Sequence, residues 1–263
     1  MNVVKRQMQI LVMAVVLIGA LGSQAVLAHA HGDAEARVVI GFAPTGDGFG
    51  AAEGWEASLY AGAEPGDETG ERFTAWVPVE NGSVAFDLPQ DVRDGMEAPF
   101  GVEDDTYVRI RTSDDGYPTF DLVGAPFTLV PGRHAVSVRL VTTVTSESVG
   151  ADDAASILFG FSPSGDGFGA SDAWEASLYA GAEAGAETGG RFSAWMGHEG
   201  GSVRFAIPQD ATDPAPFGVE DDFYLRVRST DGYPSFDLVT APVTLVPGNH
   251  TVHLAVVTSV VSD

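Results

Sequence analysis

The stretch GDGFGAAEGWEASLYAGAE at Gly46–Glu64 recurs almost letter for letter as GDGFGASDAWEASLYAGAE at Gly165–Glu183. Within its WEASLY segment, Trp55, Ala57 and Leu59 alternate with residues that would face the other way. A hydrophobic period of two predicts a half-buried β-strand, whereas a helix would show a period of 3.6. The repeated stretch therefore predicts β-structure, built in the same way at two places in the chain.

The repeat extends well beyond this stretch. Gly41–Trp76 aligns without gaps on Gly160–Trp195, and further matching segments follow in the same order. Repeats of this size fit whole domains better than the short units of a solenoid. We expect one domain at 37–145, a small and acidic linker at 146–156, and a second domain at 157–261.

Alternation of the same kind marks the other predicted strands, and Gly, Pro, Asn and Asp clusters separate them. In the first repeat these strands are RVVIGF (37–42), RFTAWV (72–77), SVAFDL (83–88), YVRIR (107–111), TFDLV (119–123), FTLV (127–130) and HAVSVRLV (134–141). Short, regularly spaced and alternating strands predict an all-β fold, with two tandem antiparallel β-sandwich domains.

The N-terminus has the features of a cleaved signal peptide, predicted at residues 1–30. Lys5 and Arg6 precede the apolar run Ile10–Leu21, and small residues allow cleavage after Ala28 or Ala30. The apolar run is shorter than the roughly 20 residues that span a bilayer. We expect a protein that is secreted, extracellular or associated with the cell surface, or periplasmic, without membrane insertion after cleavage.

Charge and composition exclude several classes of function. Without residues 1–30 the chain keeps 11 arginines against 37 acidic residues, and it contains no cysteine. Nucleic acids and anionic lipids are bound through Lys and Arg, so neither is an expected partner. The lack of cysteine excludes thiol nucleophiles and thiolate metal sites.

The second half of each repeat resembles a known family. It reads NGSVAFDLP, then TYVRIRTSDDGYPTFDL, then FTLVPGRHAVSVRL, over Ser83–Leu140 and again over Ser202–Val256. This order resembles the carboxypeptidase-regulatory-like and transthyretin-like β-sandwiches and the related collagen-adhesin repeats, which are immunoglobulin-like in architecture. The acidic APFGVEDD segment and the GDGFG segment depart from the family pattern. The resemblance implies a non-enzymatic extracellular module for adhesion, carbohydrate contact or spacing. The Lys–Asn isopeptide bond of some relatives is excluded, because the only lysine is Lys5.

The acidic loops are the candidate metal sites. Ca²⁺ prefers six to eight oxygen ligands, and adjacent carboxylates with loop carbonyls can supply many of them. The alternative is a solvated acidic face, partly neutralised by Arg109 and Arg111. The candidate calcium ligands are Glu103, Asp104, Asp105, Glu220, Asp221 and Asp222.

The GDGFG loops and the GYP turns are weaker candidates for ligand binding. Glycines allow close backbone approach to a ligand, but the plainer interpretation is a tight turn. The candidate residues are Asp47, Phe49, Tyr117, Asp166, Phe168 and Tyr233.

The tryptophans allow two interpretations. Trp55 and Trp76 lie in phase with small and apolar strand residues, which predicts core packing. Exposed aromatics on one sheet face would instead make a carbohydrate-binding module.

Histidines suggest little chemistry. His29 and His31 flank the predicted cleavage site, so a new N-terminal amine with two imidazoles is a candidate Cu²⁺ site. Only His134 recurs, as His250, and no G-x-S-x-G nucleophile motif is present. We therefore expect no enzyme, but a secreted binding or structural module of the adhesion type, with calcium as a candidate ligand and an extracellular glycan or protein as its partner.

Overall fold

The computed structural model describes residues 35–43, 54–63, 70–113, 119–147, 154–163, 173–182, 189–231 and 235–263. The secondary structure in these ranges consists of strands, which confirms the all-β prediction. Within them, no helix is long and apolar enough to cross a membrane. All described residues belong to one compact unit, Asp33–Asp263.

Each repeat contributes the same series of strands. The first repeat forms β1 (Ala36–Ala43), β2 (Trp55–Ala61), β3 (Glu71–Arg72), β4 (Val77–Pro78), β5 (Ser83–Leu88), β6 (Thr106–Thr112), β7 (Thr119–Val123) and β8 (Gly132–Glu147). The second forms β9 (Ala155–Ser162), β10 (Trp174–Ala180), β11 (Gly190–Arg191), β12 (Met196–Gly197), β13 (Ser202–Ile207), β14 (Phe223–Ser229), β15 (Ser235–Val239) and β16 (Gly248–Ser262).

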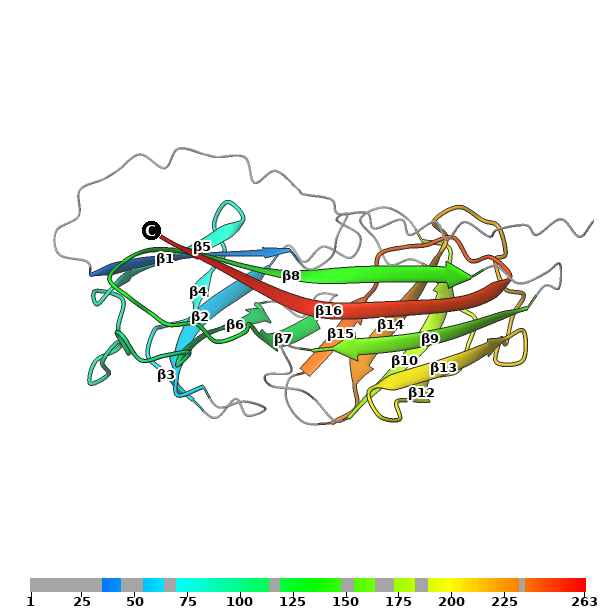
Figure 1. Cartoon of the computed structure of the whole chain (residues 1–263), viewed down its shortest axis with the longest axis horizontal. Coiled ribbons are helices and arrows are strands. Elements are labelled where there is room, and N and C mark those ends of the chain that lie inside the picture. Colours follow the sequence, from blue (N-terminus) through cyan, green and yellow to red (C-terminus); the bar gives the residue numbers. More distant parts are fainter. Residues whose placement is uncertain are drawn as a thin grey trace, which may run out of the picture. The chain divides into compact units, whose positions relative to one another are not determined.

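Two stacked sheets contain strands from both repeats (Figure 1). Sheet A has the order β13-β9-β16-β8-β1-β5, and sheet B has the order β11-β10-β14-β15-β7-β6-β2-β3, with β4 added on β2 and β12 on β10. The pairs β1–β8 and β9–β16 are parallel, which differs from the expected antiparallel pairing. They join the first and last strands of a repeat, and the long connection between these strands permits a parallel pair.

The core lies between the sheets and is made by the alternate residues that the sequence pattern identifies. Trp55, Ala57 and Leu59 are buried on β2, and β5 and β8 alternate in the same way. Side chains of both repeats belong to one continuous hydrophobic cluster. In three more of the predicted strands, at 83–88, 107–111 and 134–141, the inward residues are Val84, Phe86, Leu88, Val108, Ile110, Val136, Val138 and Leu140.

The two repeats exchange the ends of their last strands. Strand β8 pairs antiparallel with β16 over fourteen residues, from the His134–Ser262 pair to the Glu147–Asn249 pair. The first half of β8 also pairs with β1, while the first half of β16 pairs with β9. The first half of each long strand therefore pairs with the first strand of its own repeat. Its second half extends along the first half of the last strand of the other repeat, as Figure 1 shows for β8 and β16. We call this arrangement the strand exchange.

Sheet B joins the repeats a second time. Phe120 of β7 lies opposite Phe236 of β15, with one further residue pair on each side. The repeats are therefore connected through both sheets by backbone hydrogen bonds.

Some predicted boundaries differ from the observed ones. Strand β8 continues to Glu147 and β9 begins at Ala155, so both ends of the predicted linker are strand. The FTLV segment forms an isolated bridge between Phe127 and Thr106 instead of a strand. The division of the chain into domains at 37–145 and 157–261 stays a prediction.

Candidate functional site

Several predicted site residues lie outside the described ranges, so the structure says nothing of them. The predictions of a copper site and of ligand binding by the GDGFG loops and the GYP turns stay predictions. These residues are His29, His31, Asp47, Phe49, Tyr117, Asp166, Phe168 and Tyr233.

The acidic loop of the first repeat lies at the start of β6, and part of it has a clear structural role. The backbone N–H of Gly62 donates to Asp105 Oδ1 at 3.0 Å, which fixes the chain just after β2. The backbone N–H of Asp104 donates to Thr128 Oγ1, also at 3.0 Å. Short polar side chains that bond to nearby backbone in this way stabilise turns. The two aspartates therefore shape the loop, whether or not it binds an ion.

The second repeat has the same geometry, and both Asp104 and Asp221 adopt a φ of 47°, in the left-handed region. The N–H of Gly181 donates to Asp222 Oδ1 at 3.0 Å, and the N–H of Asp221 donates to Thr244 Oγ1 at 3.0 Å. Asp and Asn adopt this backbone conformation more readily than most residues. The duplication has therefore preserved a turn as well as a pair of acidic residues.

Glu103 and Glu220 are exposed, and so are Asp104 and Asp221, whereas Asp105 and Asp222 are partly buried. Among the described residues, no three His, Asp or Glu side chains lie close enough together to hold a metal ion. One oxygen of Asp105 and one of Asp222 already accept a backbone N–H. Calcium binding by these loops stays a prediction, and any such site would need ligands beyond these side chains.

The arginines expected near the acidic loop pair with other acids. Arg109 donates from Nε and Nη2 to the two carboxylate oxygens of Asp121, at 2.7 and 2.6 Å. Arg111 donates to Glu56 at 2.5 Å. Both pairs lie on the outer face of sheet B, across the strand pairs β6–β7 and β2–β6. Arg109 and Arg111, which were expected to neutralise the acidic loop, therefore pair with acidic residues of sheet B.

Aromatic rings complete this outer face. The guanidinium carbon of Arg111 lies 4.0 Å from the ring centroid of Trp76, within the range of a cation–π contact. Tyr60 stacks on Tyr107 with 5.4 Å between ring centroids, and its ring meets Trp76 edge-on at 6.3 Å. We call these residues, together with Arg109 and its partner Asp121 and with Glu56, the aromatic–arginine array.

The core prediction holds for one tryptophan and fails for the other. Trp55 is buried between the sheets and its ring meets Phe42 edge-on at 5.7 Å. Trp76 is half-buried on the outer face, in the four residues between β3 and β4. Arg72 of β3 pairs with Tyr60 of β2, and Pro78 of β4 pairs with Glu56 of β2. The two partners on β2 are four positions apart, whereas Arg72 and Pro78 are six positions apart. The segment between β3 and β4 therefore has two extra residues, which form a bulge beside Trp76.

The second repeat carries a matching array. Arg226 forms two hydrogen bonds with Asp237, at 2.7 and 2.6 Å. Arg228 lies 4.0 Å from the ring centroid of Trp195 and pairs with Glu175. The array is therefore a repeated feature of sheet B, which the sequence pattern did not reveal because its members come from four separate segments of each repeat.

The array combines positive, negative and aromatic groups at the surface. Its carboxylates are already paired, and a guanidinium group already covers one face of the Trp76 ring and of the Trp195 ring. A sugar would have to stack on the remaining ring surface or displace Arg111 and Arg228. The arrangement stabilises sheet B. Trp76 and Trp195 are partly exposed in it, whereas Tyr60 and Tyr107 are buried.

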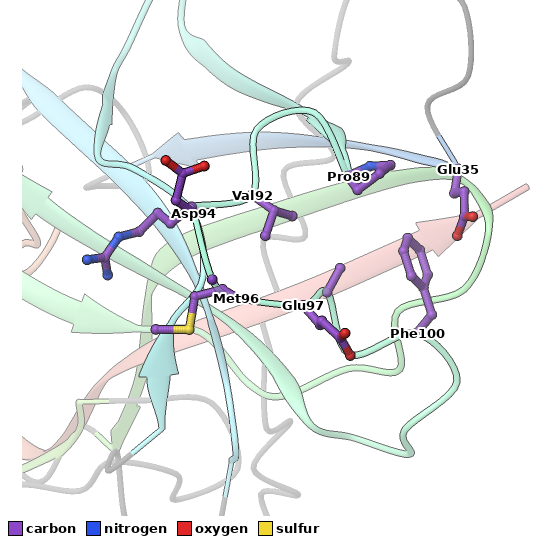
Figure 2. A pocket seen from close by; sticks show the side chains of 10 residues that line it. Glu35, Pro89, Val92, Asp94, Met96, Glu97 and Phe100 are labelled. Atoms are coloured by element: carbon purple, nitrogen blue, oxygen red, sulfur yellow. The ribbon is translucent and has the colours of Figure 1, made fainter.

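A hollow of about 450 Å³ lies beside the first repeat (Figure 2). The loop between β5 and β6 lines most of this hollow, and it is two residues longer than the corresponding loop of the second repeat. Figure 2 shows Asp94 at the opposite end of the hollow from Glu35, with Met96 and Val92 between them. The hollow is open, and its carboxylates do not converge on one point.

The two repeated histidines are buried in the sandwich. His134 Nε2 lies 2.7 Å from the carbonyl oxygen of Val130, and His134 Nδ1 lies 2.8 Å from Ser262 Oγ. His250 makes equivalent contacts with Val246 and Ser146. Both imidazoles therefore hold the strand exchange together, and neither is placed to reach a substrate.

Comparisons with known proteins add little to this description. No protein-family model matches the chain, and no curated protein matches it. The resemblance to carboxypeptidase-regulatory-like domains therefore stays a prediction.

Solved structures of a bacterial pilin show a remote likeness. The major pilin from Streptococcus pyogenes is 12% identical, with 86% of this chain and 99% of the pilin covered and a TM-score of 0.20. An alanine-substituted mutant of that pilin is 12% identical over 84% of this chain and 97% of that chain, again with a TM-score of 0.20. The T3.2 pilin from the same organism is 10% identical, covering 85% and 98%, with a TM-score of 0.18. TM-scores this low support no conclusion about fold or function.

Proposed function

We propose that the protein is a secreted, non-catalytic β-sandwich module that acts outside the cell in adhesion or as a structural element. The observation that carries this proposal is the strand exchange. The β8–β16 ladder and the β7–β15 ladder connect the repeats at the same time, one in each sheet. Two sheets that both cross from one repeat to the other resist bending far better than two domains on a flexible linker.

The partner that we propose is an extracellular surface component, a glycan or a protein. The two aromatic–arginine arrays lie on the same sheet, and their residues match one for one. A repetitive surface can be bound at both places at once, and the second contact then benefits from a high effective concentration.

The environment of the polar groups favours a non-catalytic role. His134 and His250 are 1% and 5% exposed, and their ring nitrogens contact groups of the protein itself. The carboxylates of Asp121 and Asp237 are held in two-point pairs with arginine. Groups fixed in this way serve packing and rigidity.

Binding to extracellular material tests the proposal. The chain without its predicted signal peptide would be incubated with fractionated cell-wall and capsule material, and both the bound protein and the fate of the material would be measured. We expect saturable binding that leaves the material chemically unchanged. Release of cleaved or modified products would contradict a non-catalytic function, and lack of binding to every fraction would contradict an adhesive one.

The contribution of the arrays can be measured with matched variants. Arg111→Gln changes the first array and Arg228→Gln changes the second, and the structure gives them equivalent surroundings. If both arrays bind, each single variant should lose avidity by roughly tenfold or more, and the double variant should lose more than either. Equal binding by all four proteins would exclude the arrays as the contact surface.

Carbohydrate binding is a second candidate function, because Trp76 and Trp195 are half-buried at the surface instead of lying in the core. Stacking of a sugar would change the environment of an indole ring. Titration with oligosaccharides should then shift the tryptophan fluorescence, and the shift should decrease in the Trp76→Phe and Trp195→Phe variants. No fluorescence change with any oligosaccharide would leave a protein surface as the partner.

Calcium is the ligand that we propose for the acidic loops. Thermal unfolding would be measured with EDTA or with Ca²⁺, each at low and at high NaCl. A specific site stabilises by mass action and saturates, so a shift in Tm should persist at high salt. If NaCl alone produces the full shift, general charge screening explains it, since the Debye length falls to about 3 Å at 1 M salt.

A further inference from the structure

We infer that two copies of this chain associate through the outer face of sheet A. This face consists of the residues of β1, β5, β8, β9, β13 and β16 whose side chains point away from the core, and we call it the sheet A face. Its strands alternate between buried and more exposed positions, so the members of the face follow directly from the burial pattern. The inference concerns self-association and is independent of the proposed extracellular ligand.

The sheet A face differs from the whole chain in charge. The chain has 37 acidic residues and a net charge of −24, yet only Asp87 and Glu147 are acidic among the outward positions of these strands. The C-terminal Asp263 lies at one corner, where its N–H donates to the carbonyl of Arg133. The outward arginines are Arg37, Arg133, Arg139 and Arg204.

Charge distribution selects this face for contact with a second copy. Two copies of a strongly acidic protein repel one another through most of their surfaces. The sheet A face carries about as many positive as negative groups, so the repulsion is smallest there. Arg37 is paired with Asp87 at 3.0 Å, whereas among the described residues neither Arg133 nor Arg139 forms an ion pair.

Small side chains occupy part of the face. Strand registers place Ala85, Val39, Ala135 and Val261 in one row across four strands, in that order. The next row contains Ser83, Gly41, Ser137 and Ser259. Small side chains in aligned rows allow two sheets to approach to the spacing of about 10 Å that is typical of stacked sheets.

Exposed valines add apolar surface to the face. Val261 is 64% exposed and Val257 is 37% exposed, and both lie on the exchanged half of β16. Large apolar side chains at such exposure lose contact with water when a second sheet covers them. Val257 lies opposite Arg139, so apolar and polar groups alternate along this part of the face.

The available area is sufficient for a stable dimer. Strands β5, β1, β8 and β16 lie side by side in sheet A. The six strands of the face contain 59 residues. With about 4.8 Å between strands and about 3.3 Å per residue, the whole face measures roughly 930 Å². Stable interfaces bury about 800 Å² on each partner. The outer face of sheet B is less suitable, because Trp76 and Trp195 and their arginines stand on it.

Sedimentation analysis at increasing salt tests the inference on the full chain without its predicted signal peptide. We expect a monomer–dimer equilibrium whose dissociation constant falls as NaCl rises from about 0.1 M to about 1 M, because screening removes the long-range repulsion between acidic copies. A chain that remains monomeric at every salt and protein concentration would overturn the inference.

Variants locate the interface. Val261→Asp should raise the dissociation constant of the dimer by roughly tenfold or more at every salt concentration, because an unpaired carboxylate is costly to bury. The matched control is Val219→Asp, because Val219 is 48% exposed but lies in the loop before β14. The control should dimerise like the original chain. Equal weakening by both variants, or dimerisation unaffected by Val261→Asp, would place the contact elsewhere and overturn the inference. Thermal unfolding of each variant checks that the fold is retained.

Discussion

His134 Nδ1 lies 2.8 Å from Ser262 Oγ, although the two residues are 128 positions apart in the chain. The Nε2 of the same ring lies 2.7 Å from the carbonyl oxygen of Val130, which can only accept a hydrogen bond. In the neutral ring Nε2 therefore carries the proton, and Nδ1 accepts from the serine hydroxyl. A buried imidazole of the first repeat thus holds the end of the last strand of the second.

Removing the serine hydroxyl should weaken the strand exchange. In Ser262→Ala, His134 Nδ1 loses its donor while it remains buried, so we expect a loss of about 1–3 kcal/mol in the free energy of unfolding. Ser146→Ala should have a similar effect, because Ser146 Oγ lies 2.8 Å from His250 Nδ1. Urea denaturation measures both losses.

Ser259→Ala provides the control for these two variants, since Ser259 is exposed on the outer face of the same strand. It should change the stability by less than about 0.5 kcal/mol. If all three substitutions have the same effect, the histidine contacts do not hold the exchanged strands.

The sequence predicts the inward residues correctly but not the strand exchange. Hydrophobic alternation determines which side chains face the core, and it identified Val136, Val138 and Leu140. Beyond Leu140 the inward side chains include Thr142 and Ser146, which are satisfied by hydrogen bonds with the other repeat. Polar residues at these positions hide the continuation of the strand, because their partners are distant in sequence.

The aromatic–arginine array was missed for a related reason. In RFTAWV, Trp76 alternates in phase with the polar residues Arg72 and Thr74, whereas the buried Phe73 has the opposite phase. This alternation is the sequence signal that separates Trp76 from the core residue Phe73. The other members of the array come from β2, β6 and β7, whose adjacency depends on the sheet order. A single sequence specifies the face of each residue much more directly than the neighbour of each strand.

Two adjacent glycines of the second repeat should respond differently to alanine. A Cβ on Gly189 would lie 2.2 Å from the carbonyl oxygen of Ala180, whereas a Cβ on Gly190 would meet nothing within 4 Å. Because the backbone itself blocks the first position, Gly189→Ala should destabilise the protein by more than about 2 kcal/mol. Gly190→Ala should be neutral or slightly stabilising, since alanine loses less conformational entropy on folding.

Denaturation of the two alanine variants under the same conditions checks this difference. The first repeat offers an independent comparison, because a Cβ on Gly70 would lie 2.2 Å from the carbonyl oxygen of Ala61. Gly70→Ala should therefore resemble Gly189→Ala. Similar stability of the Gly189 and Gly190 variants would mean that the close approach of Gly189 to β10 is absent in solution.

The ion pairs on sheet B should differ in strength from the pair on sheet A. The Arg109–Asp121 pair has two hydrogen bonds and side chains that are 24% and 18% exposed. The Arg37–Asp87 pair is more exposed, at 41% and 31%. Because exposed pairs are screened by water, we expect a coupling energy of about 0–1 kcal/mol for Arg37–Asp87 and a larger one for Arg109–Asp121.

Double-mutant cycles measure the two coupling energies. Arginine would be replaced by methionine and aspartate by asparagine in both pairs, so that the chemical change is the same. A coupling at Arg109–Asp121 that is no larger than at Arg37–Asp87 would mean that the two-point geometry adds nothing to stability.

Stability should also depend on pH through His253. Burial lowers the pKa of His253 below its usual value of 6.5, because the charged ring is poorly solvated there. Its cross-strand neighbours are Thr143 and Gly160, and neither carries a charge. The unfolded chain therefore binds a proton at a higher pH than the folded chain does. The stabilisation from the neutral ring is complete above about pH 6.5 and is lost as the pH falls from there through the lowered pKa.

Urea denaturation at a series of pH values between about 8 and about 5 measures this contribution of His253. The free energy of unfolding should fall less steeply with decreasing pH in His253→Gln than in the original chain, because glutamine does not titrate. Ser162→Ala removes the contact between Ser162 Oγ and His253 Nε2 at 3.2 Å but leaves the ring in place, so it should keep the steeper pH dependence. Parallel curves for His253→Gln and the original chain would show that other groups cause the decrease.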